Sequence, residues 1–192
     1  MLYIKFTIQD QQKYLDFQKV YDHMVMVRQP GFEFEEEDEE EDEDEFDWNN
    51  SSQEEINKYL DESEPEVKRY KRLFPEYANK VLESYVKYDE SIAGVYGFDS
   101  KGIFNYLEFS FEVDMDTLQK LGDDIGLVEF STGNYPFGGL ERFIMTLKAF
   151  DLIPTECYNG FTIYQFKWIS EFIYEGIELP EKTKLYKERN LD

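Results

Sequence analysis

The first thirty residues change from one hydrophobic period to another. Apolar residues occupy every second position from 2 to 8, which predicts a half-buried strand. From residue 14 to residue 25 they recur at helical spacing instead, and Asp10 stands where a helix cap is expected. Pro30 and Gly31 follow, and they should end this helix.

Two residue pairs with the spacing of a capping box predict helices after residue 50. Ser52 is followed by Glu55, and Ser63 by Glu66. Pro75 should kink or restart the second helix. The predicted helices cover 53–62 and 64–90. The expected buried stripe of the second consists of Val67, Tyr70, Phe74, Tyr77, Val81 and Tyr85.

Strand pairs around tight turns are predicted in the second half. Asn159-Gly160 is the strongest hairpin signal in the chain, because both residues tolerate the positive φ that a type I′ turn requires. Residues 99–102 contain Asp, Ser and Gly and predict a second turn. The strands joined by these turns would be 94–98 with 103–113, and 155–158 with 161–168.

The remaining pattern completes an α+β fold. We expect a short helix at 114–121, a strand at 127–131, a loop at 133–139, an amphipathic helix from Leu140 to Phe150, and a peripheral charged tail from Pro180 onward. Because strand pairs with tight turns dominate this half, the sheet should be mainly antiparallel, with helices packed on one face. The length of 192 residues fits a single domain over 1–192.

A dense block of negative charge interrupts this pattern. Thirteen of the fifteen residues from 33 to 47 are Asp or Glu. Residues 31–66 hold nineteen acids and one base, which accounts for −18 of the formal charge of −23 and leaves −5 for the rest. Like charges at this density repel and cannot pack, so a flexible acidic loop insert is expected at 31–50.

Composition restricts the function. The acidity argues against direct binding to nucleic acid or to anionic membranes, because both rely on Lys and Arg. The amino terminus lacks a signal-peptide pattern, and no apolar run is long enough to span a bilayer. With one cysteine, Cys157, no disulfide forms within the chain. We therefore expect a cytoplasmic protein without cofactors.

The acidic tract is the first candidate site. The simplest interpretation of the tract is a solvated insert without a specific binding role. A cation site is a further interpretation, but it would be weak because the EF-hand spacing is absent. The functional interpretation is an arm that docks onto a basic protein, with charge for steering and aromatic anchors for contact. The charged residues of this candidate site are Glu35, Glu36, Glu37, Asp38, Glu39, Glu40, Asp42 and Asp44, and its aromatic residues are Phe34, Phe46 and Trp48.

The second candidate is a ligand loop at 133–139, between a predicted strand and a predicted helix. Such a loop can bind phosphate through backbone N–H groups, but its glycine spacing matches neither the dinucleotide fingerprint nor a P-loop. A structural turn is therefore the simpler interpretation. A cleft here would use Tyr135, Phe137 and Arg142.

Catalytic residues are scarce. His23 is the only histidine, so every Ser–His–Asp or Cys–His scheme would need it, and a packing or surface role is expected instead. Cys157 lies on a predicted strand and should be core. The basic run at 68–72 is interpreted as internal counter-charge or as a solvated helix face.

In size, acidity and fold class the chain resembles the immunity proteins that neutralise basic nuclease toxins in bacteria. The resemblance implies a cytoplasmic, non-enzymatic inhibitor of a basic protein, and it assigns no residue. Two alternatives remain open. One is a small-ligand domain or enzyme with its cleft near 133–142. The other is an inhibitor that mimics DNA, which the nearly balanced charge outside 31–66 disfavours.

Overall fold

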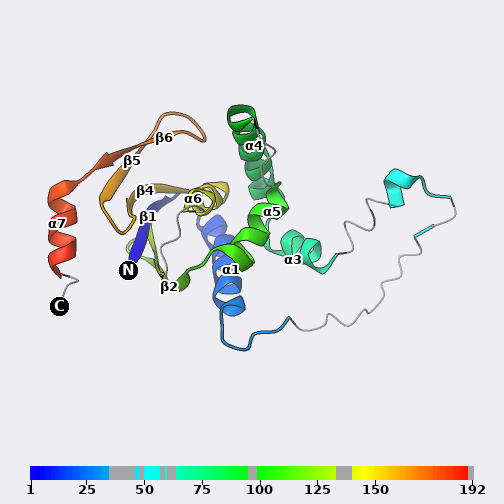
Figure 1. The fold of residues 1–192 in the computed structure, drawn as a ribbon, viewed down its shortest axis with the longest axis horizontal. Coiled ribbons are helices and arrows are strands. Elements are labelled where there is room, and N and C mark those ends of the chain that lie inside the picture. Colours follow the sequence, from blue (N-terminus) through cyan, green and yellow to red (C-terminus); the bar gives the residue numbers. More distant parts are fainter. Residues whose placement is uncertain are drawn as a thin grey trace.

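The computed structural model describes residues 1–34, 46–47, 50–56, 59, 64–94, 99–132 and 140–189. Within these ranges, six antiparallel strands form one sheet, and most of the helices lie against one of its faces (Figure 1). The predicted α+β fold with an antiparallel sheet is confirmed. The acidic tract falls between the first helix and the next helical pair, as expected of an insert.

The first strand of the chain lies at the centre of the sheet. The strands are β1 (Leu2–Ile8), β2 (Asp114–Lys120), β3 (Ile125–Ser131), β4 (Leu152–Tyr158), β5 (Ile163–Trp168) and β6 (Tyr174–Glu178). Their order across the sheet is β2-β3-β1-β4-β5-β6. Since β1 pairs with β3 on one side and β4 on the other, the first strand of the chain joins the two parts of the sheet that the second half of the chain supplies.

The helices begin and end largely where the local sequence dictates. They are α1 (Gln11–Val27), α3 (Pro65–Leu73), α4 (Glu76–Ala93), α5 (Ser100–Asn105), the π-helical turn η1 (Tyr106–Ser110), α6 (Leu140–Ala149) and α7 (Pro180–Arg189). The Asp10 carboxylate accepts hydrogen bonds from the backbone N–H groups of Gln12 and Lys13, which confirms the predicted cap of α1. Pro75 is the N-cap of α4, so the predicted restart is also confirmed.

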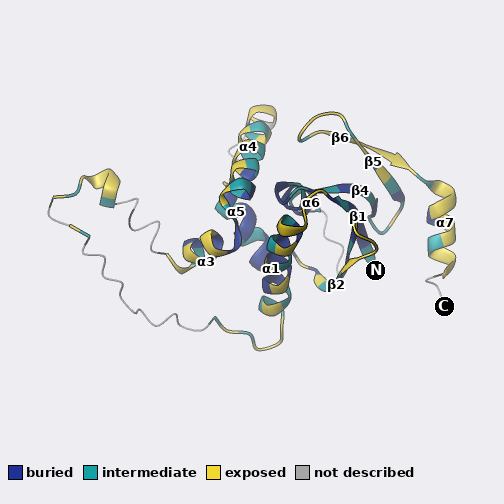
Figure 2. Cartoon of the chain, turned by 180° about the vertical axis from the view of Figure 1, so that it is seen from behind, coloured by how far each residue is buried: buried dark blue, intermediate teal, exposed yellow. Residues whose placement is uncertain are grey.

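Phenylalanine dominates the core between the sheet and the helices. Alternate residues of β1 point toward α1 and α6, and Ile4 and Phe6 are completely buried. Figure 2 shows this buried layer along β1, α1 and α6. Seven of the largest fully buried side chains are phenylalanines: Phe6, Phe17, Phe104, Phe111, Phe130, Phe143 and Phe150. The rings of Phe17 and Phe150, and of Phe130 and Phe143, pack edge to face, while Phe111 and Phe143 are stacked.

The opposite face of the sheet carries a smaller cluster under α7. Tyr3, Tyr158 and Ile163 occupy one cross-strand row, and Tyr186 of α7 packs on both tyrosines. The tail was expected to be peripheral, and most of α7 is indeed exposed. Its tyrosine nevertheless gives the second sheet face an apolar contact.

The hairpin predicted around residues 99–102 is wrong. Asp99 accepts a hydrogen bond from the N–H of Gly102 and so caps α5, rather than turning the chain between strands. The buried residues that follow, Ile103, Phe104 and Leu107, have helical spacing. A strand was expected at 103–113 as the partner of 94–98 across this turn, and the structure has α5 and η1 there instead.

Two other predictions also need correction, and one strand was missed. Residues 114–121 were expected to form a helix because acids open the segment, but they form β2, where a register shift between Met115 and Thr117 hides the alternation. The edge strand β6 was not predicted. The N-cap of α3 is Glu64, without a side-chain cap, and Ser63 lies outside the described residues. The other capping box, Ser52 with Glu55, is confirmed.

Gly126 offers a direct test of the packing between β1 and β3. A Cβ atom at this position would lie 2.2 Å from the ring of Phe6, which is fully buried, so the ring or the strand would have to shift. We expect Gly126→Ala to lower the free energy of unfolding by about 1–3 kcal/mol, as overpacking does. Urea denaturation followed by tryptophan fluorescence measures this change.

Gly122, in the turn between β2 and β3, is the matched control. A Cβ atom there would meet nothing within 4 Å. Gly122→Ala should change stability by less than about 0.5 kcal/mol. Equal stability of the two variants would show that Phe6 does not pack against Gly126 as described.

Candidate functional site

The acidic tract leaves the folded part of the protein at Phe34. Its ring lies 4.0 Å from the guanidinium carbon of Arg69, within the range of a cation–π contact. It also makes edge-to-face contacts with Phe32 and Phe109, at centroid distances of 4.9 and 5.8 Å. Phe34 was predicted to contact a partner. In the structure it contacts its own fold and fixes the point from which the tract starts.

Beneath Phe34 lies a buried cluster of charged and polar groups centred on Glu108. The carboxylate of Glu108 is fully buried. Arg69 donates to both of its oxygens, each at 3.0 Å, and the Nε2 atom of His23 lies 2.7 Å from Oε1. A bidentate guanidinium pair is the geometry best suited to a carboxylate away from water. The cluster therefore joins α1, α3 and η1.

Burial alone would raise the pKa of Glu108. The hydrogen bonds from His23 and Arg69, together with the charge of Arg69, outweigh burial and hold the pKa below its usual value. Glu108 is therefore ionised at neutral pH, and both of its oxygens are occupied by protein groups. The cluster is arranged to hold a charge in place.

Arg28 ties the end of α1 to the π-helical turn. Its guanidinium donates to four backbone carbonyl oxygens, those of Met24, Leu107, Phe111 and Val113. Burial lowers its pKa. Because one side chain satisfies carbonyls from both segments, it holds η1 in the orientation that turns Glu108 inward and leaves Phe109 exposed.

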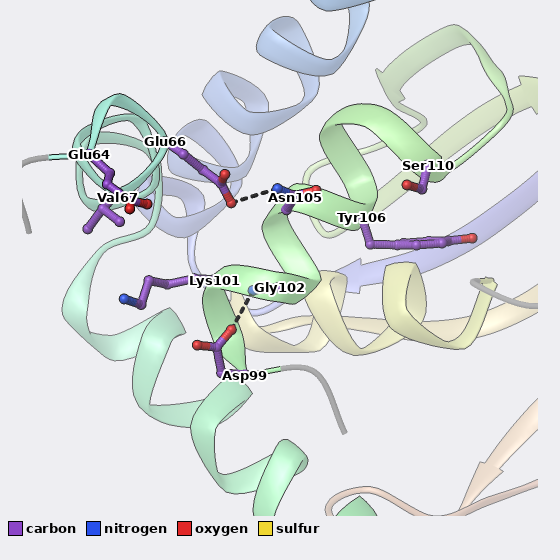
Figure 3. Close-up of a pocket in the computed structure, with 9 residues that line it drawn as sticks. All are labelled: Glu64, Glu66, Val67, Asp99, Lys101, Gly102, Asn105, Tyr106 and Ser110. Atoms are coloured by element: carbon purple, nitrogen blue, oxygen red, sulfur yellow. Dashed lines mark hydrogen bonds between the residues drawn. The ribbon is translucent and has the colours of Figure 1, made fainter. Parts of the chain in front are cut away.

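Two shallow hollows flank η1. The larger, about 390 Å³, lies between α3 and α5 and carries Glu64, Glu66 and Asp99 on its lining. Figure 3 shows Glu66 accepting a hydrogen bond from Asn105 across this hollow, at 2.7 Å. The second, about 320 Å³, lies beside Phe109 and Glu112.

Most of the predicted site residues lie outside the described ranges. These are Glu35, Glu36, Glu37, Asp38, Glu39, Glu40, Asp42, Asp44 and Trp48 of the tract, and Tyr135 and Phe137 of the 133–139 loop. Phe46 is described, and its ring stacks on Tyr59 at 4.2 Å. The guanidinium of Arg142 lies 4.5 Å from the centroid of Tyr106.

The structure refines the interpretation of the other singled-out residues. His23 is buried and hydrogen-bonded, so it is part of the charge cluster as well as the packing. In the basic run, Arg69 is the internal counter-charge of Glu108, whereas Lys68 is exposed. Cys157 is core, as predicted, and burial raises the pKa of its thiol to about 12. This thiol is therefore protonated and unreactive at neutral pH.

The Glu108 cluster was not predicted from the sequence. Its three members stand at positions 23, 69 and 108, and no local spacing connects them. The only signal was the position of Arg69 between Val67 and Tyr70 on the apolar side of its helix. That placement marks an arginine that is drawn toward the core.

Neither metal binding nor similarity to known proteins identifies the site. No group of three or more His, Cys, Asp or Glu side chains that could hold a metal ion occurs among the described residues. No helix in the described part of the chain is long and apolar enough to cross a membrane. No family model, curated protein or solved structure matches the chain.

The Glu108 cluster predicts a specific loss of stability. Glu108→Gln removes the charge while keeping the shape, so it leaves Arg69 buried without its counter-ion. We expect a loss of about 3–5 kcal/mol at pH 7, the usual consequence of breaking a buried pair. Denaturant unfolding at pH 7 measures it, and Glu178→Gln on the exposed part of β6 is the control.

The same variant has a defined pH dependence. The pKa of Glu108 is lower in the folded state than in the unfolded state, so its ionisation stabilises the fold. This stabilisation is fully present above the ordinary glutamate pKa of about 4.3 and is lost as the pH falls further. The stability gap between wild type and Glu108→Gln should therefore narrow on acidification below that value. A gap that stays constant from pH 7 to pH 3 would contradict an ionised Glu108.

Proposed function

We propose that the protein is a non-enzymatic, cytoplasmic binding protein that sequesters or inhibits a basic protein partner. A nuclease toxin is the kind of partner that its likeness to immunity proteins suggests. The observation that supports the proposal is the set of contacts that Phe34 makes at the start of the acidic tract. Phe34 contacts both Arg69 and Phe109, so the run of eleven acids begins next to a residue that packs on the folded part.

The distribution of charge favours a localised arm over an evenly acidic surface. All eleven residues from 35 to 45 are Asp or Glu, while residues outside 31–66 carry only −5. A compact block of one sign raises the rate of encounter with a basic protein by about 10- to 1,000-fold at low salt. It also makes binding strongly dependent on ionic strength, since exposed charges are screened.

The other functions remain weaker proposals. Mimicry of DNA by the whole protein would need acids spread over the folded part. A ligand cleft at 133–142 would use Arg142, which lies against Tyr106, and the rest of that loop lies outside the described residues. The described groups around Glu108 hold its charge through Arg69 and His23, which suits a structural role better than proton transfer.

Neutralising the arm tests the proposal. Residues 35–45 are replaced by Gln and Asn at their Glu and Asp positions, which keeps length and leaves Phe34 in place. Wild type and variant are used side by side to capture proteins from host lysate with a salt gradient, and the purified captured protein is then used in stopped-flow binding. We expect the association rate to fall about 10-fold or more and its salt dependence to disappear.

A control variant carries neutral residues at exposed acids of the folded part: Asp123, Asp124, Glu178 and Glu181. It should associate nearly as fast as wild type. If wild type and the arm variant capture the same protein with the same rate and salt slope, the arm is not the binding element and the proposal is wrong.

A further inference from the structure

An exposed aromatic patch lies beside the point where the acidic tract begins. Phe109 is 56% exposed, and its ring is in contact with Phe34, which in turn contacts Phe32. Single exposed apolar residues are ordinary, but three rings in contact form a continuous apolar surface. The π-helical turn explains its exposure, because Glu108 must point inward to Arg69 and the next side chain therefore points to solvent.

The smaller hollow next to this patch has the lining that a basic side chain requires. Val27, Phe111 and Val113 supply apolar wall, and the exposed acids Glu112 and Asp114 stand at its edge. Long basic side chains lay their methylene stems on apolar surface and keep the charged head at a polar rim. The charge of Arg28, which also lines the hollow, is directed to four backbone carbonyls.

The larger hollow, on the other side of η1, is also lined by acidic and apolar side chains. Glu64, Glu66 and Asp99 contribute three carboxylates against one lysine, Lys101 (Figure 3). Tyr106 and Val67 provide its apolar lining. The exposed ring of Phe109 thus belongs to a turn with an acidic hollow on each side.

We propose that this surface, made of Phe109 and the two flanking hollows, is where the basic partner docks. The occupant is a protein segment with an apolar side chain between lysines or arginines. An apolar centre within a charged rim is the usual anatomy of a binding hot spot, and the acidic rim selects a cationic partner. The inference rests on the proposed function and extends it, because it assigns specific contact to the folded part and encounter to the arm.

Charge also disfavours the two other occupants available to this surface. A second copy of the chain would bring another −23 toward Glu112 and Asp114. Residues 35–45 carry the same sign as this rim, so covering Phe109 with them would oppose like charges. A cationic segment is the occupant that reduces this repulsion.

Two matched peptides test the docking surface without the arm. Each is a fluorescent lysine-rich 12-mer, with leucine at the centre of one and serine at the centre of the other. They are titrated into the variant whose residues 35–45 are neutral. We expect the leucine peptide to bind more tightly, and Phe109→Ala in that background to weaken it about tenfold and remove the preference.

Two further variants separate the parts of the surface. Glu112→Gln with Asp114→Asn should weaken both peptides, because the rim contacts lysine rather than leucine. Phe161→Ala is the control, since Phe161 is also exposed, at 59%, but lies in the turn between β4 and β5. Amide NMR shifts on peptide addition should fall on residues 106–114 and 64–67.

The outcomes distinguish the two proposals. The docking surface is wrong if Phe109→Ala binds like its parent or if the shifts map elsewhere. It is also wrong if deleting residues 35–45, which keeps Phe34 in place, shifts the Phe109 resonances as a segment that covers the ring would. Salt-dependent capture by the intact arm would still support the proposed function in each case. If wild type neither binds the peptides nor captures a basic protein, both proposals fail.

Discussion

The buried carboxylate of Glu108 is the constraint on which the helical half of this protein depends. A carboxylate away from water needs donors, and those donors come from two helices that are distant in sequence, through His23 and Arg69. Meeting this requirement fixes α3 against α1 and sets the inward direction of the π-helical turn. The same arginine then offers its outer face to Phe34, so one interaction aligns the helices and holds the start of the acidic tract.

The sheet and the charge cluster contribute to the fold in different ways. The sheet buries apolar side chains along β1, and its stability follows from area and packing. The cluster adds little apolar area, but it restricts which arrangement of α1, α3 and η1 is allowed, since other arrangements would leave a buried charge unpaired. Buried ion pairs are weak sources of stability and stronger sources of specificity in some proteins. This pair lies beside Phe34, the residue at which the eleven consecutive acids begin, so the specificity of the fold is connected to the position where the acidic tract starts.

Elements delimited by interactions between neighbouring residues could be predicted from the sequence, whereas arrangements that depend on contacts between distant residues could not. Asp10, Pro75 and Asn159-Gly160 act within a few residues, and the elements they delimit were predicted from the sequence. The segment 103–113 was mispredicted because residues 99–102 were interpreted as a hairpin turn, whereas Asp99 caps a helix and the buried residues Ile103, Phe104 and Leu107 have helical spacing. Neither the central place of β1 nor the meeting of His23, Arg69 and Glu108 is encoded locally, so both required the structure. For the candidate site, the sequence showed the charge of the tract, but it did not show the contacts of Phe34 with Arg69 and Phe109 at the start of the tract.

The placement of Phe34 and Glu64 has a consequence for the length of the segment between them. The ring of Phe34 rests on Arg69 of α3, and Glu64 precedes the same helix, so the two residues that flank 35–63 both lie at α3. The entropy of closing a loop grows only with the logarithm of its length, so doubling such a segment adds about 0.6 kcal/mol. Its length and composition can therefore drift with little effect on folding. The frame formed by α1, α3 and η1 therefore sets where the segment begins and ends, and it does not depend on the length of the segment.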